Sequence, residues 1–325
     1  MVDTEKTLNK NQRQLQFSKA EKIINNQEKH RFFTNGKTYK KVVEYIHLFQ
    51  DSVRKIKNSL DVKKELEKDA NLKAMYDFLE KAENLTTSHP PLNKESQRFG
   101  NTAFRTWYDD LEKLFDSDFA KSLDSAFPVE STSTKLSEEI KPYISECFGN
   151  SKRIDYGTGH ELNFFCVILI LTEIGFFSKN LVQNLIQIIF KKYLSVCKTL
   201  QTLYNLEPAG SKGVYGLDDY HFLCFIFGAA ELIDNTEKMT PKEIQENLTR
   251  LEELSTQYMF FDAVYYNVKS KNGQLSQHSP VLFQISNVPL WEKVAKGLIF
   301  MYEDEVLKKI VVSQHFYFGS ILTYE

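Results

Sequence analysis

Residues 153–175 read RIDYGTGHELNFFCVILILTEIG, a glycine-rich turn that runs directly into the most apolar segment of the chain. The unbroken apolar run covers residues 164–171, before Thr172 and Glu173 interrupt it. A helix that crosses a membrane needs about 18 or more apolar residues in succession. This segment is much shorter, so we predict a helix buried in the core of a folded protein and no association with a membrane.

Helical patterns continue on both sides of this segment. Apolar residues recur at steps of three and four, the spacing of one helix face, over residues 39–56, 66–79, 104–115, 180–204, 218–234, 241–268 and 291–310. Ser18 and Glu21 form an S-x-x-E pattern that can open a first short helix. A two-residue alternation is almost confined to residues 281–285. The chain is therefore predicted to have an all-α fold.

The composition excludes several classes of protein. The 325 residues include 25 Phe, 16 Tyr and 2 Trp but only 13 Gly and 8 Pro, which excludes a disordered or collagen-like chain. Lys and Arg number 41 against 43 Asp and Glu, a net charge of −2. Because no bulk positive charge is available to attract nucleic acid or an acidic membrane, partners must be recognised by shape and local chemistry.

The N-terminal sequence bears on domain organisation and location. Residues 1–16 are polar and aperiodic, so we expect a flexible tail followed by a single helical domain over residues 17–325. The tail lacks the apolar region of a signal peptide. The cysteines, at separations of 19, 31 and 27 residues, form no C-x-x-C pair that would indicate a zinc or redox site. We expect a reducing, cytoplasmic location, with the nucleus as a second compartment.

The glycine-rich turn allows two interpretations. Gly157 and Gly159 flank Thr158 just before a helix N-terminus, where free N–H groups and the helix dipole favour an anion such as phosphate. Alternatively, the glycines form a tight turn and Thr158 caps the helix. The P-loop pattern G-x-x-x-x-G-K-[ST] does not occur in the chain.

A second glycine-rich loop, EPAGSKGVYGLDD, covers residues 207–219. Its glycines allow the backbone to approach a ligand closely, and the carboxylates of Asp218 and Asp219 could bind a hard cation. In the alternative, one of these aspartates only caps the following helix. The sequence supports the two interpretations about equally.

Two later segments, residues 277–291 and 314–319, are rich in aromatic residues and contain His278 and His315. By residue type alone, such side chains usually fill a core. No H-E-x-x-H or G-x-S-x-G motif is present to indicate a metalloprotease or a serine hydrolase.

Taken together, four segments resemble the protein phosphatase 2A activator family, also called phosphotyrosyl phosphatase activator. They are RIDYGTGHE (153–161), LEPAGSKGVYGLDDYHFL (206–223), VPLWEKVAKGLIFMY (288–302) and QHFYFGSIL (314–322), and the block at residues 96–108 fits the same family. The resemblance implies an all-helical fold with core, linker and lid parts around a deep pocket for ATP and Mg²⁺. It also implies ATP-dependent activation of the phosphatase 2A catalytic subunit, alone or with its scaffold subunit, and peptidyl-prolyl cis-trans isomerase activity on a proline-containing peptide.

The resemblance also assigns site residues. ATP binding falls on Arg153, Thr158, Gly159, Gln314, His315 and Phe316. Magnesium binding falls on the Gly213 carbonyl and on Asp219. The surface for the phosphatase and the peptide falls on Gln277, Val288, Gly297 and Met301. Gln277 stands where many members carry Glu, which removes one negative charge from that groove.

The roles of Met301 and Gly297, and the function itself, each have an alternative interpretation. Met301 could adapt to a partner surface or fill the core, and Gly297 could belong to the same contact face or allow a neighbouring helix to pack closely. Isomerase activity is supported by the resemblance alone, because the reaction needs only an apolar groove and leaves no motif. The alternative function is a non-enzymatic helical scaffold that binds the phosphatase without using nucleotide.

Overall fold

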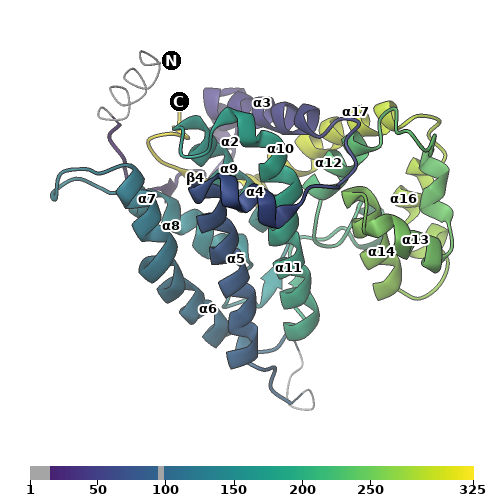
Figure 1. Ribbon diagram of the computed structural model, residues 1–325, viewed down its shortest axis with the longest axis horizontal. Helices are drawn as coiled ribbons and strands as arrows, with labels where there is room; N and C mark the ends of the chain where they lie inside the picture. The colour runs from purple at the N-terminus through teal and green to yellow at the C-terminus, as the bar shows by residue number, and fades with distance from the viewer. Residues whose placement is uncertain (1–14, 94–98) are drawn as a thin grey trace.

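A computed structural model describes residues 15–93 and 99–325 of the chain (Figure 1). Helices dominate this part of the chain, and its β-structure consists of four two-residue strands, so the all-α prediction is confirmed. The predicted flexible tail at residues 1–16 lies almost entirely outside the described residues, as does part of the block at 96–108.

The α-helices follow one another along the chain as α2 (Gln27–Asn35), α3 (Lys37–Ser52), α4 (Val62–Lys68), α5 (Ala70–Ser88), α6 (Ala103–Leu114), α7 (Ala120–Ala126), α8 (Leu136–Cys147), α9 (Thr158–Glu173), α10 (Val182–Asn184), α11 (Lys191–Tyr204), α12 (Leu223–Glu231), α13 (Leu248–Ser255), α14 (Met259–Ser270), α15 (Leu275–His278), α16 (Pro280–Ile285), α17 (Trp291–Tyr302) and α18 (Ile310–Ser313). Short 3₁₀ or π turns are η2 (Phe115–Phe119), η3 (Lys179–Leu181), η4 (Leu185–Phe190), η5 (Gly213–Tyr215), η6 (Pro241–Gln245) and η7 (Glu303–Leu307). The strands are β1 (Glu21–Lys22), β2 (Asp155–Tyr156), β3 (Glu207–Pro208) and β4 (Tyr317–Phe318).

Helix α9 lies in the core, as the apolar segment predicts. Every residue from position 160 to position 172 is buried. The helix is apolar on all sides, which is typical of a helix that is surrounded by other elements. It packs along α8 and α3, and the Phe164 ring stacks on Tyr193 of α11 with 3.9 Å between ring centroids.

The predicted first helix at Ser18 is wrong. Instead, β1 pairs in antiparallel fashion with β4, close to the C-terminus. The Ser18 N–H donates to Glu139 Oε2 on α8 at 3.0 Å, so a distant carboxylate takes the place of the local Glu21. The first described helix, α2, begins after Asn26, whose side chain accepts a hydrogen bond from the Lys29 N–H.

Other boundaries also differ from the sequence pattern. The predicted helix over 241–268 is divided into η6, α13 and α14, because Asn247 caps the start of α13 and the backbone at Tyr258 is extended before α14. The segment 281–285, which alternates in sequence, belongs to helix α16. The pattern over 218–234 begins as a loop, since α12 starts only at Leu223.

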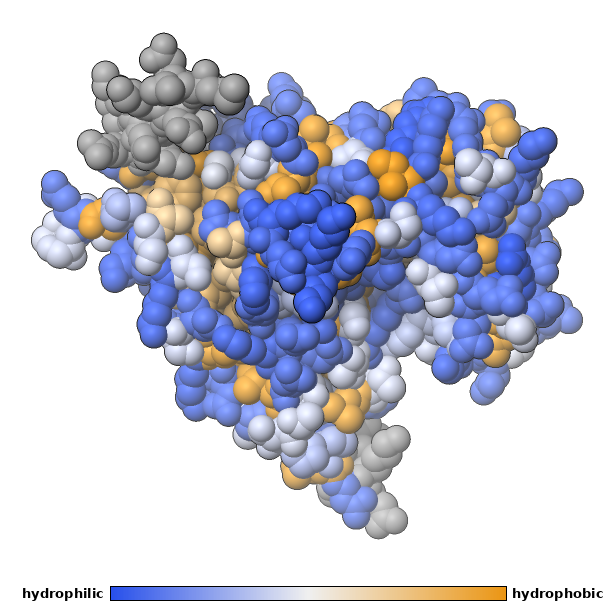
Figure 2. Space-filling view, in the orientation of Figure 1, coloured by the Kyte–Doolittle hydropathy of each residue, from blue (hydrophilic) through white to orange (hydrophobic). Residues whose placement is uncertain are grey.

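The helices form two groups that are connected by α12 and α17 (Figure 1). Helices α5 to α8 and α11 lie together on one side, and α13, α14 and α16 form a smaller group on the other. Helix α12 contacts α14 of the smaller group and also packs against α17 and α3. The face shown in Figure 2 is mostly hydrophilic, with hydrophobic residues in small groups. None of the helices in the described part of the chain has the length and apolarity to cross a membrane.

Candidate functional site

The parallel pairing of β2 with β3 brings the two glycine-rich loops together. The Ala209 N–H extends this pairing by donating to the Tyr156 carbonyl at 2.7 Å. A Cβ atom on Gly157 would lie only 2.4 Å from the Ala209 carbonyl oxygen. Glycine is therefore needed at position 157, and the two loops form one site.

Helix α9 begins inside this site. Gly157 occupies its N-cap position with extended backbone and gives no side-chain hydrogen bond to the helix. Thr158 is the first helical residue, so the alternative in which Thr158 caps the helix is wrong. N–H groups of a first helical turn have no intrahelical acceptor, and with the helix dipole they favour an anion.

A cavity of about 400 Å³ opens at this helix N-terminus, and Arg153, Thr158, Gly159 and His315 line it. Small-molecule pockets usually enclose about 300–1,000 Å³, so the volume suits a nucleotide. We call it the Thr158 cavity. Its other lining residues are Lys22, Glu146, Asn150, Asp155, His160, Asn163, Ala209, Gly210, Lys212, Glu305, Lys309, Val311 and Val312.

Cations from distant parts of the chain surround the Thr158 cavity. Lys22 Nζ lies 3.1 Å from Glu146 Oε1, and Lys212 Nζ lies 2.6 Å from Glu305 Oε1. Lys309 also lines the cavity and is exposed. A polyanionic ligand would compete with these carboxylates for the ammonium groups. The lysines that already line the cavity can therefore pair with the negative charge of a ligand.

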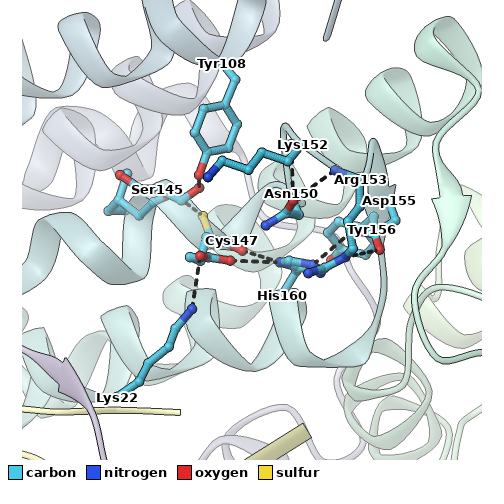
Figure 3. Close-up of polar contacts among 12 residues, drawn as sticks. Lys22, Tyr108, Ser145, Cys147, Asn150, Lys152, Arg153, Asp155, Tyr156 and His160 are labelled. Carbon is cyan, nitrogen blue, oxygen red and sulfur yellow. Dashed lines mark hydrogen bonds and ion pairs between the residues drawn. The ribbon is translucent and has the colours of Figure 1, made fainter. Parts of the chain in front are cut away.

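Arg153, Asp155 and His160 form the polar wall of the cavity (Figure 3). Arg153 Nε donates to Asp155 Oδ2 at 2.6 Å, and His160 Nδ1 lies 2.5 Å from the Glu146 carbonyl oxygen. Burial favours a higher pKa for Asp155, but contacts with His160 and Arg153 outweigh burial and lower that pKa below its ordinary value. Asp155 and His160 lie within the segment RIDYGTGHE but were not predicted as ligands, and Lys22 lies outside every predicted segment, because no diagnostic spacing marks these residues.

The three predicted residues at 314–316 have different environments. His315 lines the cavity, and burial together with nearby Lys22 and Arg153 lowers its pKa, so its imidazole is neutral at pH 7. Gln314 is exposed, and its amide donates to the Val311 carbonyl at 3.3 Å. Phe316 is buried in the core, so any contact that it makes with a ligand has to come from its backbone.

In the second loop, Asp218 and Asp219 have different roles. Asp218 Oδ2 accepts hydrogen bonds of 2.9 Å from the N–H groups of Tyr220 and His221, which makes it the residue that caps the turn. Asp219 instead pairs with Lys271 Nζ at 2.8 Å. It lines a hollow of about 50 Å³ that shares Thr158, Ala209, Gly210, Lys212 and Glu305 with the Thr158 cavity. The capping interpretation therefore holds for Asp218, and the Asp219 carboxylate lies beside the cavity.

Ser211 brings the two predicted magnesium residues together. Its hydroxyl donates to Asp219 Oδ1 at 2.8 Å and accepts from the Gly213 N–H at 2.9 Å. The Gly213 carbonyl accepts a 3.0 Å hydrogen bond from the Gly216 N–H and retains a second lone pair. One carboxylate and one carbonyl could supply two oxygens to a Mg²⁺ ion that takes its others from phosphate and water and displaces Lys271 from Asp219 Oδ2. The described residues contain no cluster of three or more His, Cys, Asp or Glu side chains that could hold a metal by itself.

The residues of the predicted phosphatase surface lie on three neighbouring segments of the chain: Gln277 on α15, Val288 just after α16, and Gly297 and Met301 on α17. Gln277 is exposed and Val288 is half-buried. Gly297 is exposed, and a Cβ atom added to it would meet no atom within 4 Å. The alternative in which Gly297 allows a neighbouring helix to pack closely is therefore wrong, and position 297 faces open space.

The same helix carries one large apolar residue that the resemblance does not assign. Phe300, three residues after Gly297, is 64% exposed. Met301 is half-buried and packs partly against the core, so the core alternative holds in part, and its role at a partner surface stays a prediction. Helix α17 continues through η7, which contributes Glu305 to the Thr158 cavity. The exposed face of α17 and the cavity wall are thus adjacent parts of one segment.

Comparison with known proteins gives consistent matches along the chain. The family model described as phosphotyrosyl phosphate activator (PTPA) protein matches residues 20–324. A serine/threonine-protein phosphatase 2A activator 2 from Candida albicans is 40% identical over 88% of this chain and 77% of that protein. The protein of the same name from Schizosaccharomyces pombe is 35% identical over 94% of this chain and 83% of its own length.

A solved structure supports the same assignment. The crystal structure of the PP2A phosphatase activator Ypa1 matches with a TM-score of 0.82 and 28% identity, over 95% of this chain and 96% of that chain. The helical fold, the match over residues 20–324 and the identity to these relatives show that this chain belongs to the phosphotyrosyl phosphate activator family.

Proposed function

We propose that this chain activates the catalytic subunit of protein phosphatase 2A, alone or with its scaffold subunit, and that it uses bound ATP and Mg²⁺ to do so. The names of the relatives from Candida albicans and Schizosaccharomyces pombe support activation of phosphatase 2A. The observation that carries nucleotide use is the Thr158 cavity, where a helix N-terminus and cationic side chains lie around one space, with Asp219 in the adjoining hollow.

Each part of the site has a role in this proposal. The Thr158 and Gly159 backbone at the start of α9 would bind phosphate oxygens, with Lys212 and Lys309 adding positive charge. Asp219 and the Gly213 carbonyl would hold Mg²⁺, which supplies charge neutralisation at the phosphates. Arg153 is oriented by Asp155 through its Nε, which leaves its terminal nitrogens available for a ligand.

The connection between the cavity and the docking surface supports coupling of nucleotide to activation. Helix α17, with Gly297 and Phe300 on its exposed face, leads through η7 directly to Glu305 in the cavity wall. A phosphatase bound to α17 would therefore lie next to the segment that contacts the nucleotide. This arrangement favours an activator over a scaffold that binds without nucleotide.

The test combines nucleotide binding with phosphatase activation. ATP with Mg²⁺ should raise the melting temperature of the isolated protein, because a ligand that binds the native state stabilises it by RT ln(1 + [L]/Kd). The same nucleotide should be required for activation of inactive phosphatase 2A catalytic subunit. Full activation without nucleotide, by a protein whose melting temperature ATP does not change, would support the scaffold instead.

Prolyl isomerisation remains a prediction from the family resemblance. It requires a groove that favours a twisted amide, and such a groove has no diagnostic residues. A protease-coupled assay with a proline-containing peptide tests it directly. Equal rates of cis-trans isomerisation in the presence and absence of the protein would remove this activity from the proposal.

A further inference from the structure

The carboxylate of Asp219 joins the second glycine-rich loop to the connection between α14 and α15. Asp219 Oδ2 lies 2.8 Å from Nζ of Lys271, the residue that follows α14. The side chains of Lys271 and Asp219 are 23% and 22% exposed, so the ion pair is partly shielded from solvent. Asp219 Oδ1 accepts a hydrogen bond from the Ser211 hydroxyl at 2.8 Å. Both oxygens of this carboxylate are therefore engaged by groups of this chain.

A second contact between α14 and the same loop is buried. Asn267, which is 3% exposed, donates from its amide to Asp218 Oδ1 at 2.8 Å and accepts from the Ser279 hydroxyl at 2.7 Å. This contact holds α14 against the loop from inside the protein. The ammonium group of Lys271 stands on a flexible four-carbon stem and can leave its partner without moving the backbone. The buried contact is thus fixed, and the ion pair is exchangeable.

Lys271 also begins the turn that leads to the predicted phosphatase surface. Its N–H makes a long hydrogen bond of 3.4 Å to the Val268 carbonyl, and α14 ends at the preceding residue. Residues 272–274 are exposed, and α15 follows directly with Gln277. The ion pair therefore ties the approach to Gln277 to the residue that is predicted to bind magnesium.

Resting on the ATP and Mg²⁺ binding proposed above, we infer that Lys271 competes with Mg²⁺ for the Asp219 carboxylate, so that the metal releases the turn over residues 271–274. A carboxylate that binds Mg²⁺ at close range brings the ammonium group near a divalent cation of the same sign, and the two repel each other. The flexible lysine is the partner that moves. Lys271 is thus a positioning residue, which links the metal to the Gln277 end of the predicted phosphatase surface.

The first test compares the Lys271→Met variant with the parent by calorimetry, with ATP titrated in the presence and in the absence of Mg²⁺. The measured quantity is the factor by which Mg²⁺ strengthens ATP binding. A partly exposed ion pair changes an equilibrium by up to about fivefold, so this factor should rise about two- to fivefold in the variant. Affinity for ATP without Mg²⁺ should stay within about twofold, because Lys271 lines neither the Thr158 cavity nor the adjoining hollow.

The matched control is Lys269→Met, which removes the same charge two residues earlier. Lys269 Nζ donates to the Tyr265 hydroxyl at 3.3 Å and is exposed, so this variant leaves Asp219 and its partner in place. The control should show the same Mg²⁺ factor as the parent. Equal Mg²⁺ factors for Lys271→Met and the parent would overturn the inference. An equal rise in both variants would also overturn it, because the rise would then report only a general loss of positive charge.

The second test uses the parent alone and measures amide hydrogen exchange over residues 271–278 by mass spectrometry. Adding Mg²⁺ to the ATP-bound protein should raise exchange in this segment, and unchanged exchange would overturn the release of the turn. These negative results leave the proposed function intact as long as Mg²⁺ strengthens ATP binding to the parent. A parent that binds ATP equally with and without Mg²⁺ refutes both the metal site and this inference.

Discussion

The side-chain carboxylate of Glu161 accepts a 2.9 Å hydrogen bond from the backbone N–H of Leu223, the first residue of α12. The same oxygen accepts a second bond of 2.9 Å from the Phe222 N–H, and Glu161 is fully buried. Because Glu161 lies in the first turn of α9, the helix that follows the first glycine loop caps the helix that follows the second. This contact fixes the two sides of the Thr158 cavity relative to each other.

Glu161→Ala should destabilise the protein by about 2–4 kcal/mol, because it leaves two buried N–H groups without an acceptor and removes a helix cap. Urea unfolding followed by circular dichroism measures the loss. Glu161→Gln keeps an oxygen in place and should lose clearly less. An alanine variant as stable as the parent would show that the cap contributes nothing.

Gly159→Ala should keep or raise stability while weakening ATP binding. An added Cβ atom would lie 3.6 Å from Val312 Cγ1, an ordinary contact, and alanine stabilises a helix by up to about 1 kcal/mol relative to glycine. The new methyl group would nevertheless stand in the lining of the cavity. Melting curves and ATP titration test the two effects separately. Unchanged ATP affinity in the alanine variant would place the phosphates away from this turn.

The Asp219→Asn variant should melt at a temperature close to that of the parent. It should lose most of the Mg²⁺-dependent stabilisation of the protein by ATP, and phosphatase activation should be lost as well. The capping bonds come from Asp218, and a partly exposed ion pair such as Asp219–Lys271 contributes at most about 1 kcal/mol, so stability should change little. A magnesium site with few protein ligands does depend on it. Calorimetry with and without Mg²⁺ decides. The control is Asp218→Ala, which removes the capping oxygen and should lose about 1 kcal/mol of stability. Equal ATP–Mg²⁺ affinities for Asp219→Asn and the parent would contradict the metal assignment.

Gly297→Asp should leave the isolated protein folded and abolish binding to the phosphatase catalytic subunit. Position 297 faces open space, so the aspartate fits, but in a complex its charge would be buried without a partner. Gly297→Ala is the matched control, since it adds a Cβ atom without charge and should retain binding. Co-purification with the catalytic subunit gives the measurement. Retained binding by a folded Gly297→Asp variant would remove this face from the interface.

Glu231→Gln should become more stable relative to the parent as the pH rises. Glu231 is buried on α12, where Oε2 accepts a 2.7 Å hydrogen bond from the Met259 N–H and Oε1 has no partner among the described residues. Burial raises the pKa of Glu231 to about 8, from an ordinary value of 4.5. The folded state therefore holds this proton between those pH values while the unfolded state has released it, so stability falls as the pH rises through that window.

The measurement for Glu231 is the difference in unfolding free energy between Glu231→Gln and the parent at pH 5 and at pH 8. The variant has no carboxyl group to titrate there, so the difference should grow with pH, by at most about 1.4 kcal/mol per pH unit. A difference that is independent of pH would show that Glu231 keeps the same protonation state in both folded and unfolded protein.

Local sequence determined the helical class and the position of the buried helix α9. Its run of apolar residues has to be buried whatever surrounds it, and the three- and four-residue spacing elsewhere defines helix faces without reference to partners. The glycine loops were also visible in the sequence, because glycine before a helix N-terminus is a local signal. Both patterns depend only on residues that lie within one or two helical turns of each other along the chain.

Tertiary structure decided the contacts that join distant segments. The Ser18 N–H bonds to Glu139 instead of Glu21, and Asp218 rather than Asp219 caps the turn. His160 likewise lies between the Glu146 carbonyl, at the end of another helix, and the Asp155 carboxylate. Spacing along the chain does not encode such contacts, because a carboxylate accepts any donor that the packing of the helices brings within reach.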